Sequence, residues 1–328
     1  MKNVNRTTSF KKNEEVEKLL GLLDKYLSNV EDELTNTISS SIHPPIFVFG
    51  CARSGTTVLH QYLINNIKSI YPSNFISRFF YAPYLGGIFY KLFTQLDTKG
   101  ELLGNYNNSS IESTYTSDLG KTKGILSPNE FWYFWRKHFP INIKGTIDVD
   151  KINKSEAIRF RNRIYAIQNL FEGPFISKGM IANNCIDYLS ELFPNAIFVY
   201  IKRNLYSNSK SLYKARKDFF GTTDEWYSFY PKEPLFYENL SSEEQVVLQV
   251  IDTNHEIESS LANIHNGRVV KLEYESFCEN PKIILQKLNS LDSSIIISDN
   301  SEPTKFSFSD KDSNETIKSI IKTINIKK

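Results

Sequence analysis

The stretch that decides the fold is PPIFVFGCARSGTTVLHQYLINN, residues 44–66. Its first apolar run, Ile46–Phe49, is short and rich in aromatic and branched residues, which is typical of a strand buried in a parallel sheet. A loop of small residues follows, and then apolar residues recur at helical spacing: Val58, Leu59, Tyr62 and Leu63. The order of strand, glycine loop and helix predicts a βα unit with an anion site at its loop.

The loop itself, residues 50–57, has the frame of a phosphate-binding P-loop, with Gly50 and Gly55 five apart. Glycines let the backbone curl so that its N–H groups point at an anion. Thr56 stands where a nucleoside triphosphatase has lysine, and Arg53 supplies a charge from within the loop. The hydroxyl donors are Ser54, Thr56 and Thr57. This pattern predicts a site for a small anionic bridge without a metal; the alternative is a glycine-rich turn with no ligand.

A second candidate anion site follows the apolar strand predicted at Ala196–Ile201. Arg203 stands at the end of that strand, and Ser211 lies two turns into the helix predicted after it. An arginine fork and a hydroxyl can hold one isolated phosphate, and ligands of open parallel sheets bind at strand ends. Taken alone the pair is weak, since surface arginines and serines are common.

The rest of the chain has the alternation of an α/β protein. Residues 175–201 indicate a strand, a helix and a second strand, and residues 241–262 predict a long helix before a strand at Val269–Tyr274. Near the start, leucines and valines at helical spacing predict an amphipathic helix, which Pro44-Pro45 separates from the main domain. We therefore divide the chain into an extension with a linker, residues 1–43, and a domain at 44–328.

Composition narrows the class of protein. The 328 residues are 40% hydrophobic with a formal charge of +2, which indicates a globular protein and not a nucleic-acid binder held by bulk charge. The three cysteines, Cys51, Cys185 and Cys278, have neither metal-ligand nor disulfide-framework spacing. The first residues do not form a secretory signal, and the apolar runs are too short to span a membrane. We expect a cytoplasmic protein.

The two anion sites together resemble those of the family of sulfotransferases that use 3′-phosphoadenylyl sulfate (PAPS). The family's loop resembles IFVFGCARSGTT, and its 3′-phosphate motif resembles VYIKRN followed by Ser211. A third segment, VVKLEYESFCENPKIILQKL, is similar to the family's strand, Tyr-Glu, loop and helix. The aromatic stretches YPSNFISRFFYAPYLGG and LSPNEFWYFWRKHF look like those of a bacterial branch.

This resemblance implies a three-layer α/β fold, a parallel sheet flanked by helices, similar to that of the P-loop kinases. The residues that it assigns to the 5′-phosphosulfate of PAPS are Arg53, Ser54, Gly55, Thr56 and Thr57. It assigns Arg203 and Ser211 to the 3′-phosphate, and Val58 and Tyr274 to the adenine. PAPS would leave as adenosine 3′,5′-bisphosphate, and the donor implies no metal.

The catalytic residues are only partly implied. Charge grows on the bridging oxygen during sulfuryl transfer, so Arg53 and Lys178 are the expected stabilising cations. Where cytosolic members have their catalytic histidine, two residues after Lys178, this chain has Met180, and the YPSNFIS region lacks the glutamate of other branches.

Glu130 is the best remaining candidate for the base, because the aromatic residues around it would desolvate its carboxylate. The alternative is that Glu130 only starts a helix after Pro128, where a carboxylate suits the dipole. His138 and His60 are weaker candidates.

The acceptor stays open at this stage. The aromatic segments 71–93 and 131–139 could line its pocket or belong to the core. A glycan, lipid, phenol or peptide hydroxyl or amine is compatible, with carbohydrate preferred. The rival functions are a P-loop kinase-like phosphotransferase and a protein that binds PAPS or its product without turnover. The oligomeric state is open, because the first helix can pack on a partner as readily as on its own domain.

Overall fold

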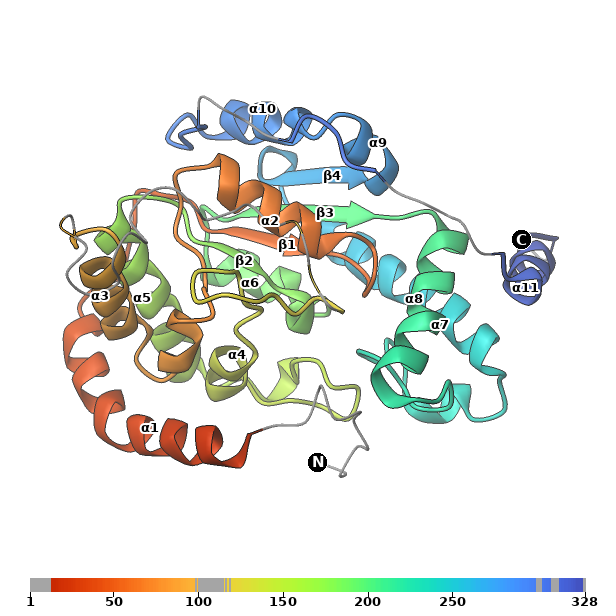
Figure 1. Cartoon of the computed structure of the whole chain (residues 1–328), viewed down its shortest axis with the longest axis horizontal. Coiled ribbons are helices and arrows are strands. Elements are labelled where there is room, and N and C mark those ends of the chain that lie inside the picture. Colours follow the sequence, from red (N-terminus) through yellow and green to blue (C-terminus); the bar gives the residue numbers. More distant parts are fainter. Residues whose placement is uncertain are drawn as a thin grey trace.

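The centre of the molecule is a parallel sheet of four strands in the order β2-β1-β3-β4 (Figure 1). The computed structural model describes residues 13–97, 99, 115, 117, 119–298, 303–307 and 313–326. The strands are β1 (Ile46–Phe49), β2 (Ile176–Lys178), β3 (Ile197–Lys202) and β4 (Val269–Glu273). Ile46 pairs with both Ile176 and Ile197, so β1 lies between the two strands predicted around residues 175–201. The predicted parallel α/β fold is confirmed.

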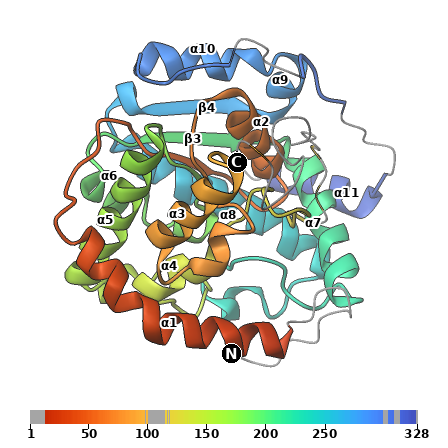
Figure 2. The ribbon, with the colours of Figure 1, turned by 60° about the vertical axis from the view of Figure 1, so that its left-hand side comes forward.

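Side chains alternate between the two faces of the sheet and divide the core in two. Ile46, Val48 and Val199 face α2 (Thr56–Asn66), α9 (Tyr274–Glu279) and α10 (Lys282–Leu291). The helices against the opposite face are α4 (Trp132–His138), α5 (Lys154–Phe171), α6 (Ile186–Leu192) and α8 (Ser242–Ala262). Phe47 and Phe198 pack on that side, with rings 6.2 Å apart. The result is the expected three layers (Figure 2).

The helices that follow β3 begin where a side chain accepts a hydrogen bond from a backbone N–H of the first turn. Helix α7 (Leu205–Phe220) starts after Asn204, whose side chain accepts a hydrogen bond from Ser207 N. Helix α8 begins with a capping box between Ser241 and Glu244, next to the predicted start at residue 241. Strand β4 ends one residue earlier than predicted, because Tyr274 already begins α9. Helix α11 (Glu315–Ile326) packs on α7 and α8.

The predicted N-terminal helix is α1 (Glu14–Thr35), and it packs against α3 (Pro83–Thr94) and α5. Glu31 of α1 is fully buried, and its carboxylate accepts hydrogen bonds from Tyr84 N at 2.7 Å and Leu85 N at 3.1 Å. It therefore caps α3 from another helix. Burial raises the pKa of Glu31 to about 7.

Seven rings of the two aromatic segments are buried in the core. Phe131, Phe134, Trp135 and Phe139 of segment 131–139 are buried between α4, α5 and the sheet. In segment 71–93, Tyr71, Phe80 and Tyr90 are buried as well. These seven side chains are therefore part of the core.

Cys51, Cys185 and Cys278 are buried free thiols. Within the described residues, no helix combines the length and the apolar character that a membrane crossing requires.

Candidate active site

The loop after β1 has the backbone that its glycines predict. Gly55 adopts a left-handed φ of 102° and is the N-cap of α2, and Arg53 also has a positive φ, 68°. No side chain of the described residues caps the first amides of α2, which leaves them available to an anion. A Cβ on Gly50 would lie 2.6 Å from Ser54 Oγ and 2.7 Å from Ile201 O, so only glycine lets the loop pack this closely on β3.

Two asparagines hold the loop from outside, and no sequence motif points to either. Asn208 of α7 donates through Nδ2 to Ala52 O at 2.8 Å, and Asn183 donates to Gly50 O at 3.1 Å. Because these side chains bind the loop's carbonyl groups, they fix the curl that turns its amides toward an anion. Their roles depend on contacts more than 130 residues apart in the chain.

The structure brings the second anion site against the loop. Arg203 Nη1 donates to Arg53 O at 3.2 Å, and Arg53 Nε donates to Ser211 Oγ at 3.2 Å. The Arg203 guanidinium also lies over the Tyr274 ring, 4.9 Å from its centroid. A Cβ on Gly55 would come within 2.2 Å of that ring, so Tyr274 closes one side of the loop. These residues follow the carboxyl ends of β1, β3 and β4, so they meet at the same edge of the sheet.

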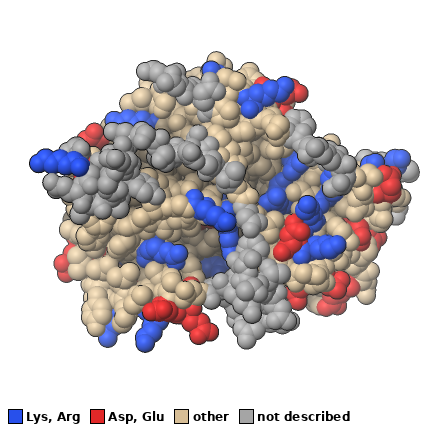
Figure 3. All heavy atoms as spheres, in the orientation of Figure 1, with Lys and Arg blue, Asp and Glu red and all other residues tan. Residues whose placement is uncertain are grey.

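Two polar atoms at this site have no partner of their own. Ser54 Oγ and Arg203 Nε are both buried, and neither has a hydrogen-bond partner in the part of the chain that the structure describes. Buried polar atoms are usually paired, so a pair of orphans beside free helix amides suits an anionic ligand. Figure 3 shows Lys and Arg side chains gathered around a hollow near the middle of one face.

Lys178 and Glu130 meet on the other side of the loop. Lys178, at the end of β2, is 4% exposed, and its Nζ lies 2.6 Å from Glu130 Oε1 and 2.9 Å from Thr57 Oγ1. Thr57 thus faces this pair, whereas Thr56 Oγ1 is turned toward Met180 Sδ at 3.6 Å. Val58, in the first turn of α2, is partly buried against the core. The sequence named Lys178 and Glu130 separately, but only the fold pairs them.

The alternative role for Glu130 is wrong. Helix α4 begins at Trp132, with Phe131 as its N-cap at a φ of 57°, so no acidic residue lies in its first turn. Asn129 positions this segment: its N–H donates to Pro72 O at 2.6 Å, and its Oδ1 accepts from Phe131 N at 2.9 Å. The carboxylate of Glu130 is thereby turned to Lys178 and not to a helix amide.

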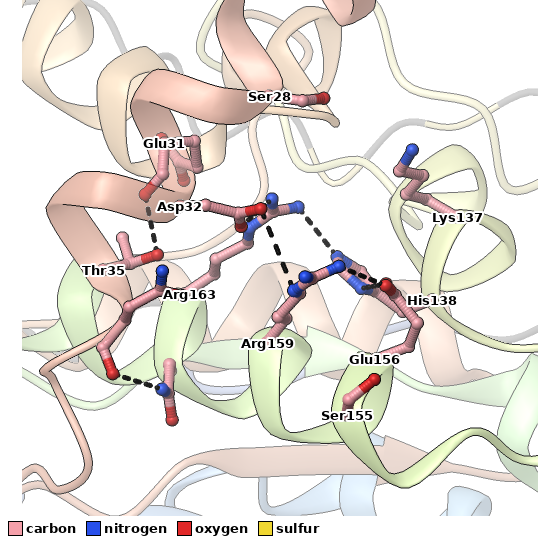
Figure 4. A network of polar contacts seen from close by, with 12 residues as sticks. Ser28, Glu31, Asp32, Thr35, Lys137, His138, Ser155, Glu156, Arg159 and Arg163 are labelled. Atoms are coloured by element: carbon pink, nitrogen blue, oxygen red, sulfur yellow. Dashed lines mark hydrogen bonds and ion pairs between the residues drawn. The ribbon is translucent and has the colours of Figure 1, made fainter.

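Neither candidate histidine reaches the loop. His60 Nε2 lies 3.2 Å from Ile176 O inside the core, and burial lowers its pKa to about 4. His138 Nδ1 donates to Glu156 Oε2 at 3.1 Å while its Nε2 accepts from Arg163 Nη1 at 2.9 Å (Figure 4). Burial likewise lowers the pKa of His138 to about 4. With both ring nitrogens engaged, His138 is a structural residue.

Comparison with known proteins agrees with this geometry. A family model described as "Sulfotransferase family" matches residues 44–291. The fold is similar to the crystal structure of sulfotransferase STF1 from Mycobacterium tuberculosis H37Rv, with a TM-score of 0.53 and 14% identity over 98% of this chain and 83% of that one. Sulfotransferase STF9 from Mycobacterium avium gives a TM-score of 0.54 and 14% identity over 99% and 79%. The sequence has no significant match among curated proteins.

Proposed function

The chain belongs to the sulfotransferase family, and on that premise we propose that it transfers a sulfuryl group from PAPS to an acceptor hydroxyl or amine. The observation that carries this proposal is the contact between the two anion sites, in which Arg53 reaches Ser211 while Arg203 holds the carbonyl of Arg53. PAPS carries a phosphosulfate and a separate 3′-phosphate on one adenosine, which calls for two adjoining anion sites of this kind.

The donor fits the residues present. The amides at the start of α2, with Ser54, Gly55, Thr56 and Thr57, would hold the 5′-phosphosulfate, and Ser54 Oγ has no competing partner among the described residues. Arg203 and Ser211 would hold the 3′-phosphate through a guanidinium fork and a hydroxyl. Tyr274 and Val58 would lie along the adenine. Arg53, bonded to Ser211, is shared between the two anion sites.

The chemistry assigns distinct tasks to the side chains at the other side of the loop. PAPS supplies an activated sulfuryl group, whose transfer develops negative charge on the leaving oxygen. The Lys178 ammonium beside Thr57 and the loop amides would stabilise that charge. Glu130 would take the proton of the acceptor, and its contact with Lys178 holds the carboxylate in place for this task.

The two rival functions find less support. A kinase-like enzyme would need a lysine where Thr56 stands, and the Thr56 side chain is turned to Met180. A protein that binds without turnover would not need a carboxylate and an ammonium at the loop. Carbohydrate stays the preferred acceptor.

We assign residues 44–328 to the catalytic domain, with residues 1–43 as an extension. We place the activity in the cytoplasm, whose reducing conditions suit three free thiols.

The test is transfer of label from ³⁵S-labelled PAPS to fractionated lysate of the source organism, alongside γ-labelled ATP with magnesium. We expect labelled product from PAPS alone, and its loss in Arg53→Ala at unchanged thermal stability. Phosphoryl transfer from ATP without sulfuryl transfer would establish the kinase alternative. Tight binding of adenosine 3′,5′-bisphosphate without any product would establish binding without turnover.

A further inference from the structure

Helix α1 carries apolar side chains on two of its faces. The inner face packs on α3 and α5 and buries Leu20. A second row of apolar side chains, each between 36% and 65% exposed, lies on the outer face, since its members recur three or four residues apart. We call this row the outer stripe: Leu19, Leu22, Leu23, Tyr26, Val30 and Leu34. Isolated exposed leucines are common on protein surfaces, but six apolar side chains along one helix indicate an interaction site.

Polar contacts fix α1 to its own domain, so the outer stripe is a preformed surface. Glu31 caps α3, and Asp32 Oδ1 lies 2.8 Å from Arg163 Nη2 of α5. Near the other end of the helix, Glu17 Oε1 accepts a hydrogen bond from Tyr133 OH at 2.6 Å. Figure 2 shows α1 along one edge of the molecule, with the rest of the fold on one side of it. The outer stripe is the part of this helix that its own domain leaves exposed.

The charge of α1 argues against a membrane as the partner of this stripe. The helix, EEVEKLLGLLDKYLSNVEDELT, has two lysines and seven acidic residues. A helix that lies on a membrane surface is instead rich in Lys and Arg on its polar face, because these residues bind anionic lipid headgroups. An apolar stripe flanked by charges of both signs suits a protein surface with complementary charges.

The outer stripe has nearly the same spacing in both directions from its centre. Leu23 and Leu19 lie three and seven residues before Tyr26. Val30 and Leu34 lie four and eight residues after it. In an antiparallel second copy of α1 centred on Tyr26, each apolar residue would therefore meet an apolar residue of the other helix.

The exposed charges beside the stripe agree with that arrangement. Lys18 lies at its start and Glu33 near its end, and both side chains are exposed. Antiparallel pairing brings Lys18 of each copy beside Glu33 of the other copy, so the contact forms twice. Parallel pairing would instead place the two copies of Lys18 at one level and the two copies of Glu33 at another. The charge pattern therefore favours the antiparallel pair.

We propose that two copies of this chain associate through the outer stripe, as a symmetric dimer whose two-fold axis passes near Tyr26. The stripe extends over about 22 Å from Leu19 to Leu34, at about 1.5 Å per residue. Association removes its apolar side chains from water, and the two contacts between Lys18 and Glu33 set the register. The dimer does not depend on the proposed sulfuryl transfer. A dimer that transfers no sulfate would contradict only the proposed function, and an active monomer would contradict only the dimer.

The first test measures association of the full chain by sedimentation equilibrium, where we expect dimers to predominate at about 100 µM, as for an interface of modest size. Tyr26→Lys places two ammonium groups at the axis, so its dissociation constant should rise about 100-fold. Because Tyr26 is 65% exposed, this variant should keep its thermal stability. The matched control is Leu235→Lys, since Leu235 is 73% exposed and lies outside α1; its dissociation constant should stay within about twofold of the wild type. A monomeric wild type, or an equal change in both variants, would overturn the proposal.

The second test exchanges the charges at the two ends of the stripe. Lys18→Glu and Glu33→Lys should each raise the dissociation constant about tenfold, because each creates two contacts between like charges. The double variant restores opposite charges in reverse order and should return to within about threefold of the wild type. A double variant as weak as the single ones would overturn the antiparallel pairing.

Flotation of the same variants with phosphatidylglycerol vesicles tests the membrane alternative. We expect the wild type to stay in solution. A wild-type monomer that binds these vesicles, less strongly after Lys18→Glu and more strongly after Glu33→Lys, would assign the outer stripe to a lipid surface and overturn the dimer.

Discussion

Two clusters of paired charge, each with one buried cation, can be compared in this protein. The site cluster consists of Thr57, Lys178 and Glu130, and it joins the phosphate loop to the segment that precedes α4. The α5 network consists of Asp32, His138, Glu156, Arg159 and Arg163 and joins α1, α4 and α5 (Figure 4). Each contains paired charges and lies next to aromatic side chains, so residue types alone do not separate them.

The backbone around the two clusters differs. The α5 network is carried by helices, and its members sit on regular turns. The residues with positive φ next to the site cluster and its loop are Arg53, Gly55, Leu119, Gly120 and Phe131. Three of these are not glycine, and such conformations cost free energy that a fold retains where they position reacting groups. Strain of this kind supports the role that we propose for the site cluster, and the α5 network has none among its members.

The largest effect on turnover should appear when one substitution in the site cluster is compared with one in the α5 network. Glu130→Gln removes the proposed base but keeps its shape, and we expect kcat to fall about 1,000-fold, within the range for general base catalysis. His138→Gln should leave kcat of the folded protein unchanged, since its ring is occupied by Glu156 and Arg163. The measurement is single-turnover transfer from labelled PAPS. A loss of turnover in His138→Gln alone would reverse the comparison.

The parts of the site that the sequence predicted are those fixed by strand ends. Arg203 and the Gly50–Gly55 loop follow adjacent parallel strands, so the fold alone brings them to one edge. Asn183 and Asn208 escaped prediction, because each acts through a contact distant in the chain and belongs to no motif. His138 is a candidate in the sequence because it lies near Glu130, but the packing of the core buries its ring and lowers its pKa.

A second comparison tests whether the α5 network stabilises the fold. Arg163 is 2% exposed and holds Asp32 at 2.8 Å, so Arg163→Met leaves His138 Nε2 without its donor and Asp32 with only the longer contact to Arg159 at 3.8 Å. We expect a loss of about 3 kcal/mol in the free energy of unfolding, as for a broken buried pair. The matched control is Arg159→Met, since Arg159 lies on the same helix and contacts the same Asp32 but is 45% exposed; its loss should cost no more than about 1 kcal/mol. Equal losses, measured by urea denaturation, would contradict the distinction.

The two anion sites should respond differently to ligands with and without a 3′-phosphate. Arg203→Ala should weaken PAPS binding by roughly 30-fold, about 2 kcal/mol for a lost charged contact, and change the affinity for adenylyl sulfate much less, because that ligand has no 3′-phosphate. Lys202→Ala is the control, since its neighbouring ammonium binds Glu258 and not the loop. Calorimetry of the wild type and both variants with each ligand gives the six affinities needed. The same loss for both ligands would remove Arg203 from the 3′-phosphate site.

The smallest effect is on stability and comes from His60, which lies on the loop's own helix but faces the core. Burial, aided by nearby Lys178, lowers its pKa from 6.5 to about 4, so below pH 6.5 the unfolded chain binds a proton that the folded chain does not. Stability must therefore fall as pH falls through this window, by about 2 kcal/mol between pH 7 and pH 5. His60→Gln keeps an N–H donor for Ile176 O but does not titrate. The difference in unfolding free energy between wild type and this variant should therefore shrink or change sign on acidification. A difference that is constant from pH 7 to pH 5 would show that His60 takes up its proton in the folded chain as readily as in the unfolded chain. A charged His60 beside Lys178 would then belong with the site cluster.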